Sequence, residues 1–175
     1  MGASRPSSQK VSDTFEIVSR SAEATEQFGE RLGQRLTAGD VVALVGELGS
    51  GKTTLIRGLA RGLGIDPALV KSPTFILLRE YPGPIPLIHI DGYRLDGTSG
   101  AVVWEDPDWL FSPTKVTVIE WAERFVAWLP EEYVEAQLEH KTTNQRALRF
   151  LSHGPRSAQL VSALTQTTSH DPARD

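Results

Sequence analysis

The first half of the chain contains four stretches whose pattern of apolar and polar positions predicts regular structure. Polar and apolar residues alternate from Thr14 to Val18, as they do in a strand with one buried face. Val41 to Val45 is continuously apolar, which indicates a strand covered on both faces, and Lys52 to Leu63 has helical spacing. Between the two strands we expect a helix capped by Ser21. Its buried stripe comprises the apolar residues that recur every four positions: Phe28, Leu32 and Leu36.

The second half of the chain alternates between short apolar runs and polar segments. These runs predict three strands, one helix that stops before Pro130, and a terminal pair of strands around a polar turn. In chain order they are Phe75 to Tyr81, Leu87 to Ile90, Val116 to Ile119, Glu123 to Leu129, Tyr133 to Glu139 and Ala147 to Leu151. Buried strands mixed with helices favour an α/β sandwich, with a central, mostly parallel sheet flanked by helices and with antiparallel terminal strands.

Both ends of the chain lack the apolar spacing of the middle. Residues 1–12 are polar and rich in Ser, so we expect a disordered tail without the apolar core of a signal peptide. Residues 153–175 contain many Ser, Thr and Pro residues, which predicts a loose tail with a weak helical turn at Leu160 to Leu164. The folded unit is therefore expected to be a single domain formed by residues 13–152.

The composition narrows the class of protein. The 175 residues carry a formal net charge of -4 and include no cysteine, which excludes a disulfide framework, a thiolate metal site and a cysteine nucleophile. No apolar stretch approaches the ~20 residues that a membrane span requires. The acidic balance argues against a free-standing DNA or RNA binder held by phosphate contacts. We therefore expect a cytoplasmic protein without membrane or DNA contacts, which can still work beside RNA on another protein's surface.

A glycine-rich loop carries the strongest chemical signal, because Gly46 to Thr53 matches the phosphate-binding motif Gly-x-x-x-x-Gly-Lys-Thr without gaps. Glycines allow the backbone to wrap tightly, so that successive N–H groups and the start of the next helix face phosphate oxygens. Lys52 then reaches the terminal phosphates, and the Thr53 hydroxyl binds magnesium. A chance match in a Gly-rich turn is the alternative, against which the flanking strand and helix argue. The candidate nucleotide-binding residues are Gly46, Glu47, Leu48, Gly49, Ser50, Gly51, Lys52, Thr53 and Thr54.

A phosphate loop needs a carboxylate at a neighbouring strand end to hold magnesium, and two residues qualify. Asp91 and Glu120 each follow directly on an apolar run. Both therefore lie where open α/β sheets bind ligands, beyond the carboxyl ends of the strands. Each could instead be an ordinary solvated strand terminus. We take Lys52, Asp91 and Glu120 as candidate catalytic residues, and Thr53, Asp91 and Glu120 as candidate magnesium ligands.

Side chains near these positions allow two interpretations each. His89 shares a face with Asp91 in an extended strand, and it is either a catalytic base or, as we favour, a packed residue that orients Asp91. Thr74 can offer a hydroxyl to a γ-phosphate and metal, or it belongs to an ordinary turn. Four tryptophans either pack in the core or, in the acidic segment with Trp104 and Trp109, face a partner.

Four segments of the chain, in this order, resemble the bacterial TsaE (YjeE) family. The phosphate loop is shared by many proteins, whereas the His-x-Asp-x-Tyr-Arg-Leu and Glu-Trp elements are far more specific. The matches span about Phe15 to Phe150, nearly the whole of the expected folded part. The matching segments are Gly39 to Leu63, Ser72 to Phe75, His89 to Leu95 and Val118 to Trp121.

The resemblance implies a small, magnesium-dependent ATPase with a P-loop NTPase-like fold, which supports threonylcarbamoylation of the adenosine beside the anticodon of tRNA. It implies a TsaD–TsaB pair as the partner that performs the transfer, so that this chain's link to tRNA is indirect. It also implies that Thr53 and Glu120 bind magnesium and that Asp91 is a metal or water partner. By the same resemblance, Arg146 lies near the adenine of ATP, and the Ser21-Ala22 region also reaches the nucleotide.

One segment departs from the family's pattern. After Leu95 the family usually has a Glu-rich helical segment, whereas this chain has Asp96 to Phe111 with two tryptophans. The departure concerns the way in which that face docks on partners, and it leaves the nucleotide-binding residues untouched.

Two rival classes of protein use the same kind of loop. A small-molecule kinase would normally add a lid with several arginines and an acceptor pocket, and only scattered arginines lie between the loop and Arg124. A GTP switch would need an Asn-Lys-x-Asp element at a strand end, and the sequence contains none. A P-loop small-molecule kinase is therefore the main alternative to an ATPase.

Overall fold

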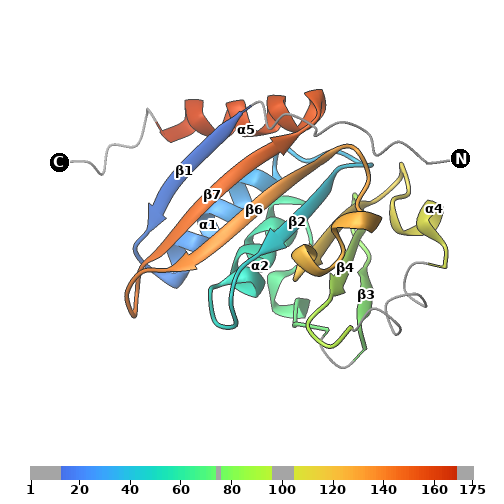
Figure 1. Ribbon diagram of the computed structural model, residues 1–175, viewed down its shortest axis with the longest axis horizontal. Coiled ribbons are helices and arrows are strands. Elements are labelled where there is room, and N and C mark those ends of the chain that lie inside the picture. The colour runs from blue at the N-terminus through green and yellow to red at the C-terminus, as the bar shows by residue number, and fades with distance from the viewer. Residues whose placement is uncertain (1–12, 74–75, 96–104, 169–175) are drawn as a thin grey trace, which may run out of the picture.

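The computed structural model describes residues 13–73, 76–95 and 105–168, and its central feature is a seven-stranded sheet (Figure 1). The order of the strands in the sheet is β1-β7-β6-β2-β5-β4-β3. The strands are β1 (Thr14–Ser19), β2 (Val41–Val45), β3 (Leu78–Tyr81), β4 (Leu87–Asp91), β5 (Val116–Glu120), β6 (Tyr133–His140) and β7 (Arg146–His153). The helices are α1 (Ala22–Gly33), α2 (Lys52–Gly62), α4 (Pro107–Leu110) and α5 (Pro155–Thr168), with short turns η1 (Pro67–Leu69), η2 (Ala122–Arg124) and η3 (Val126–Trp128).

The centre of the sheet is parallel, as the apolar runs predicted. Strands β6, β2, β5 and β4 run in one direction, whereas β7 and β1 add antiparallel strands at one edge and β3 at the other. Parallel strands place their carboxyl ends at the same edge of the sheet. The chain segments that leave β2, β4 and β5 therefore meet there, and Asp91 stands in register with Glu120.

Helices α1, α2 and α5 share the core on one face of the sheet. Phe28 and Leu32 of the predicted stripe are buried on α1, and Leu36 is buried too, although it lies three residues past the end of the helix. Phe28, Phe15 of β1 and Phe150 of β7 stack on one another, with ring centroids 5.9 to 6.3 Å apart. Leu110 of α4 and Phe125 belong to a second core, on the other face. In the described ranges, none of the helices has both the length and the apolar character needed to cross a membrane.

Helices α1 and α2 meet through glycines, so that their backbones touch directly. A Cβ atom at Gly58 would overlap the carbonyl oxygen of Glu26, and one at Gly29 would overlap that of Leu55. Because no side chain intervenes, α1 fixes the position of α2, the helix that begins at the phosphate loop. The glycines of this contact are Gly29 and Gly33 of α1 and Gly58 and Gly62 of α2.

The prediction of a loose C-terminal tail is wrong for most of its length. Residues Pro155–Thr168 form α5, whose Leu160, Val161 and Leu164 are buried in the main core. The Arg156 guanidinium binds the Asp40 carboxylate, with Nη2 to Oδ2 at 2.9 Å, and so ties the helix to the start of β2. The sequence did not predict this helix, because its few apolar residues stand among many Ser and Thr residues. Residues 1–12 and 169–175, the expected tail ends, lie outside the described residues.

Two other elements are shorter or looser than predicted. Strand β3 begins at Leu78, because Leu77 has φ of 66° and its N–H donates to the carbonyl of Pro73 in a turn. Phe75, where the strand was expected to begin, lies outside the described residues. In place of one helix over residues 123–129, the chain forms the turns η2 and η3 after a left-handed residue, Trp121.

Candidate functional site

The loop between β2 and α2 has the geometry of an anion cradle. Gly51 has φ of 101°, a conformation that side-chain-bearing residues rarely adopt, and there the chain turns into α2. Gly51, the N-cap residue of α2, supplies no side-chain hydrogen bond to the first turn of the helix. The backbone N–H groups of that turn can therefore donate to a ligand. Uncapped N–H groups at a helix N-terminus, together with the helix dipole, favour an anion such as phosphate.

Lys52 folds back over this loop. Its ammonium donates to the carbonyl oxygens of Gly46, at 2.5 Å, and Glu47, at 2.9 Å, and lies 4.1 Å from the centre of the Trp121 ring. Burial lowers the pKa of Lys52, and nearby carboxylates, Glu120 first among them, oppose that shift. The ammonium is therefore a cation held by neutral carbonyl groups, which a phosphate would replace with charged oxygens.

Thr53 and Glu120, two of the three expected magnesium ligands, lie side by side although 67 positions separate them. The Thr53 hydroxyl donates to Glu120 Oε1 over 3.2 Å. Thr53 is in the first turn of α2 and Glu120 ends β5, so the parallel pairing of β2 with β5 brings them together. Magnesium is usually held by oxygen ligands, with one or two carboxylates and the phosphates of a substrate. These residues fit that ion.

Asp91 completes the acidic edge of the site. It is buried and in register with Glu120, one strand further along the sheet. Its Oδ2 accepts a hydrogen bond from the Ser72 hydroxyl at 2.5 Å, and its Oδ1 accepts one from the Tyr93 N–H at 2.9 Å. These bonds fix the carboxylate at the strand end. The other hydroxyl candidate of this region, Thr74, lies outside the described residues.

His89 is packed inside the protein, as expected, but it orients a different carboxylate. Its Nε2 lies 2.8 Å from Glu120 Oε1, and both residues are buried. The expectation that it orients Asp91 is therefore wrong. Position along β4 predicted which face the ring occupies, whereas its partner depends on the register with β5, which no local pattern reveals.

A small cavity of about 110 Å³ adjoins the other side of the loop. There the guanidinium of Arg146 comes within 3.5 Å of the Gly49 carbonyl oxygen, 97 positions away in the chain. Three of the residues around the cavity escaped sequence reasoning. Thr143 and Asn144 lie in a polar hairpin turn, which resembles any solvated loop, and Thr25 lies within α1. The cavity is lined by Ser21, Ala22, Thr25, Gly51, Thr54, Thr143, Asn144 and Arg146.

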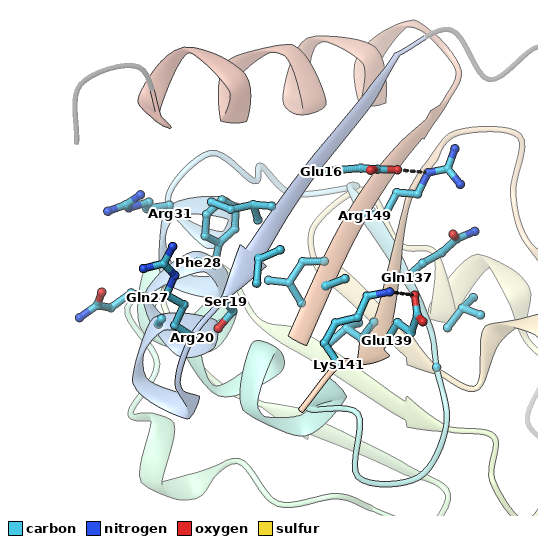
Figure 2. Close-up of a pocket in the computed structure, with 18 residues that line it drawn as sticks. Glu16, Ser19, Arg20, Gln27, Phe28, Arg31, Gln137, Glu139, Lys141 and Arg149 are labelled. Atoms are coloured by element: carbon cyan, nitrogen blue, oxygen red, sulfur yellow. Dashed lines mark ion pairs between the residues drawn. The ribbon is translucent and has the colours of Figure 1, made fainter. Parts of the chain in front are cut away.

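A much larger hollow, of about 1360 Å³, lies over β1, β7 and β6 and borders the loop at Gly46 (Figure 2). Its charged side chains are largely paired with one another. Glu16 binds Arg149 and Glu139 binds Lys141, each at 2.9 Å (Figure 2). Arg20 and Arg31 also line the hollow, whereas Lys52, Thr53, Asp91 and Glu120 do not, so the hollow lies beside the candidate site and not at it.

Trp121 is the aromatic residue that sequence reasoning did not place in the site. Its φ of 60° turns the chain sharply after β5, and its ring lies over the Lys52 ammonium and 5.1 Å from the Tyr93 ring. Trp109 is 38% exposed and lies under the Lys115 ammonium. Trp104, the other tryptophan of the expected partner-facing segment, lies outside the described residues.

Comparison with known proteins gives consistent matches. The model of the family described as "Threonylcarbamoyl adenosine biosynthesis protein TsaE" matches residues 19–148. The chain is 47% identical over 118 residues to a Streptomyces coelicolor protein named tRNA threonylcarbamoyladenosine biosynthesis protein TsaE, a match that covers 65% of this chain and 77% of the relative. It is 43% identical over 104 residues to the Synechocystis protein of that name, covering 58% of this chain and 66% of the relative.

The fold matches as well. The crystal structure of Bacillus subtilis YdiB superposes with a TM-score of 0.73 at 27% sequence identity, and the match covers 89% of this chain and 97% of that one. Both comparisons extend along most of the chain, and the range matched by the family model, residues 19–148, contains the loop, both strand-end carboxylates and Arg146. The resemblance inferred from the motifs is confirmed, and the chain belongs to the TsaE family.

Proposed function

We propose that the protein is a magnesium-dependent ATPase that supports the formation of threonylcarbamoyladenosine in tRNA. The observation that carries this proposal is the contact between Thr53 and Glu120 beside the phosphate loop. P-loop NTPases use a hydroxyl and a carboxylate in this arrangement to hold magnesium, with a lysine on the terminal phosphates. Membership of the TsaE family supplies the link to tRNA modification.

Each residue has a defined task in this proposal. Lys52 exchanges its carbonyl partners for phosphate oxygens, and the N–H groups of the loop and of α2 bind the remaining ones. Thr53 and Glu120 hold the magnesium ion, which neutralises the charge that develops on the phosphates during transfer. Asp91 is placed to orient a water molecule or the ion's water shell. Arg146 and the cavity beside it receive the nucleoside.

The proposed partner is a TsaD–TsaB pair, which closes the site and contacts the tRNA. Leu48, at the tip of the loop, is 75% exposed, so solvent reaches this side of the cradle in the isolated chain. Closure of such a site excludes water and completes the set of catalytic groups, and a partner surface can supply the missing wall. A net charge of -4 is consistent with RNA contacts that the partner makes in place of this chain. The proposed compartment of both proteins is the cytoplasm.

The test is steady-state ATP hydrolysis at saturating magnesium, measured for the protein alone and with the cognate TsaD–TsaB pair at fixed salt. We expect slow turnover alone and a rise of at least about tenfold with the pair, as for sites completed in trans. Glu120→Gln keeps the shape of the side chain, so it should abolish the stimulated rate without preventing assembly. Fast turnover alone that the pair leaves unchanged would contradict the proposal. Phosphate transfer to a small metabolite would instead support a kinase.

A further inference from the structure

We infer that His89 is a positioning residue, which holds the Glu120 carboxylate in the orientation that a magnesium ion requires. The inference rests on the proposed function, because it concerns how the proposed magnesium site is kept in shape. His89 itself does not reach the ion in this account. It acts through one hydrogen bond on the carboxylate that does.

The contact is short and fully enclosed. His89 is 0% exposed in the middle of β4, and Glu120 is 3% exposed at the end of β5. Nε2 of the ring lies 2.8 Å from Oε1 of the carboxylate. In such a low-dielectric setting a hydrogen bond to a charged group is strong, and leaving that group unpartnered is costly. Water cannot readily replace the imidazole here.

The environment of the ring indicates which nitrogen carries the proton. Within the described part of the chain, Nδ1 of His89 is buried and has no hydrogen-bond partner. An N–H at that position would be a buried donor without an acceptor, which is unfavourable. The arrangement therefore favours a hydrogen on Nε2, which the ring donates to Glu120, over one on Nδ1.

This donor restricts a carboxylate that has a second task. Glu120 also accepts a hydrogen bond from the Thr53 hydroxyl, over 3.2 Å to the same oxygen, Oε1, that His89 contacts. With Oε1 held by His89, the carboxylate cannot rotate freely about its terminal bond, and Oε2, 3.5 Å from the Thr53 hydroxyl, is the oxygen that the imidazole leaves to an ion. Hydrogen bonds that orient a metal ligand in this way typically contribute a factor of roughly 10 to 100 in metal affinity.

The test uses two substitutions at one position and a matched control elsewhere in the sheet. His89→Gln retains an N–H donor at similar reach, whereas His89→Leu retains the bulk and removes the donor. His153→Leu breaks the other histidine–glutamate contact of the sheet, His153 Nε2 to Glu135 Oε2 at 2.8 Å. ATP binding is measured by calorimetry over a range of magnesium concentrations and in EDTA, and thermal melting of each variant checks its fold.

We expect His89→Leu to weaken the apparent affinity for magnesium by about tenfold or more. ATP affinity in EDTA should be unchanged, and His89→Gln should recover most of the loss. His153→Leu should behave as the wild type. An unchanged magnesium dependence in His89→Leu would overturn the inference, as would an equal loss with and without magnesium or a failure of His89→Gln to restore binding.

Two other results, a wild-type protein that does not respond to magnesium and a His89→Leu variant that does not fold, can be told apart from those above. If wild-type protein binds ATP equally with and without magnesium, the proposed function fails and the inference fails with it, before any variant is compared. If His89→Leu does not fold, the imidazole of the wild-type protein is observed directly by long-range proton–nitrogen NMR. The inference is supported if the metal-free protein carries the ring hydrogen on Nε2 and if the slowly exchanging signal of that hydrogen disappears in Glu120→Gln. A hydrogen on Nδ1 overturns the inference.

Discussion

In the free protein the Lys52 ammonium already has hydrogen-bond acceptors, and a phosphate would have to compete with them. Its ammonium is held by two carbonyl oxygens, the Ser50 hydroxyl and an aromatic ring, and among the described residues no carboxylate forms an ion pair with it. Binding of a phosphate is therefore an exchange of partners. The gain comes from the difference between charged phosphate oxygens and neutral carbonyls, because charge-assisted hydrogen bonds are roughly twice as strong.

Removing that ammonium should weaken nucleotide binding. For Lys52→Ala and for Lys52→Met, which keeps an unbranched stem against Trp121, we expect ATP affinity to fall by at least about tenfold, or about 1.4 kcal/mol. Lys141→Ala is the matched control, because it removes the same charge from an exposed pair with Glu139. Calorimetric titration of ATP in magnesium decides the matter. An affinity equal to that of the wild type would refute the assignment of the loop.

The residues of the site differ in how far sequence alone could place them. Glu120 and Asp91 were predictable because each ends a buried apolar run, and a parallel sheet collects such ends at one edge. The partner of His89 was not predictable, because it depends on how two strands align. Trp121 was missed for a different reason, since only its left-handed backbone turns the ring over the loop.

At the scale of elements, the contact between α1 and α2 is the feature that fixes the loop. The sequence did not predict this contact, because a glycine in a helix usually indicates low helix propensity and not a position of close helix packing. The C-terminal helix α5 was hidden too, by a Ser- and Thr-rich composition that masks three buried apolar residues. The strands and the helices α1 and α2 follow from their apolar patterns to within a few residues.

Because α1 and α2 touch through glycines, replacing one of these glycines with alanine should lower the stability of the protein and not raise it. At an open helical position, Gly→Ala stabilises by about 1 kcal/mol, because alanine has the higher helix propensity. Gly58→Ala should instead destabilise the protein by about 1–3 kcal/mol, since the methyl group must push the backbone of α1 away. Urea unfolding measures the difference, with Gln27→Ala on the exposed side of α1 as the control. A more stable Gly58→Ala variant would mean that the helices do not touch as described.

At the scale of the whole molecule, the site is assembled from segments that no single element contains. The start of α1, the phosphate loop, the ends of β4 and β5, and the β6–β7 hairpin all border it. A ligand that contacts all of them binds the folded chain and not the unfolded one. Nucleotide should therefore stabilise the entire domain and not only the loop.

Magnesium and ATP together should raise the free energy of unfolding by about 2.7 kcal/mol when ATP is present at a hundred times its dissociation constant. Chelation of the metal with EDTA should remove most of that increase, because Thr53 and Glu120 then lose the ion that joins them to the phosphates. Chemical denaturation with and without ligand measures both values. At the same ATP concentration, a tenfold loss of affinity limits the increase in Lys52→Ala to about 1.4 kcal/mol. A full increase in that variant would point to a second nucleotide site.

The pairing of β1 with β7 has a consequence for the way in which the protein emerges from the ribosome. The backbone of Asp13 binds Ser152, 139 positions later, and the three stacked phenylalanines join the same distant ends. Contacts of such long range form late, because the chain between them must first be ordered. Synthesis of the phosphate loop alone therefore yields no complete nucleotide site. Arg146, the residue proposed to contact the nucleoside, belongs to the β6–β7 hairpin, so a nascent chain that stops before β7 would lack that side of the small cavity.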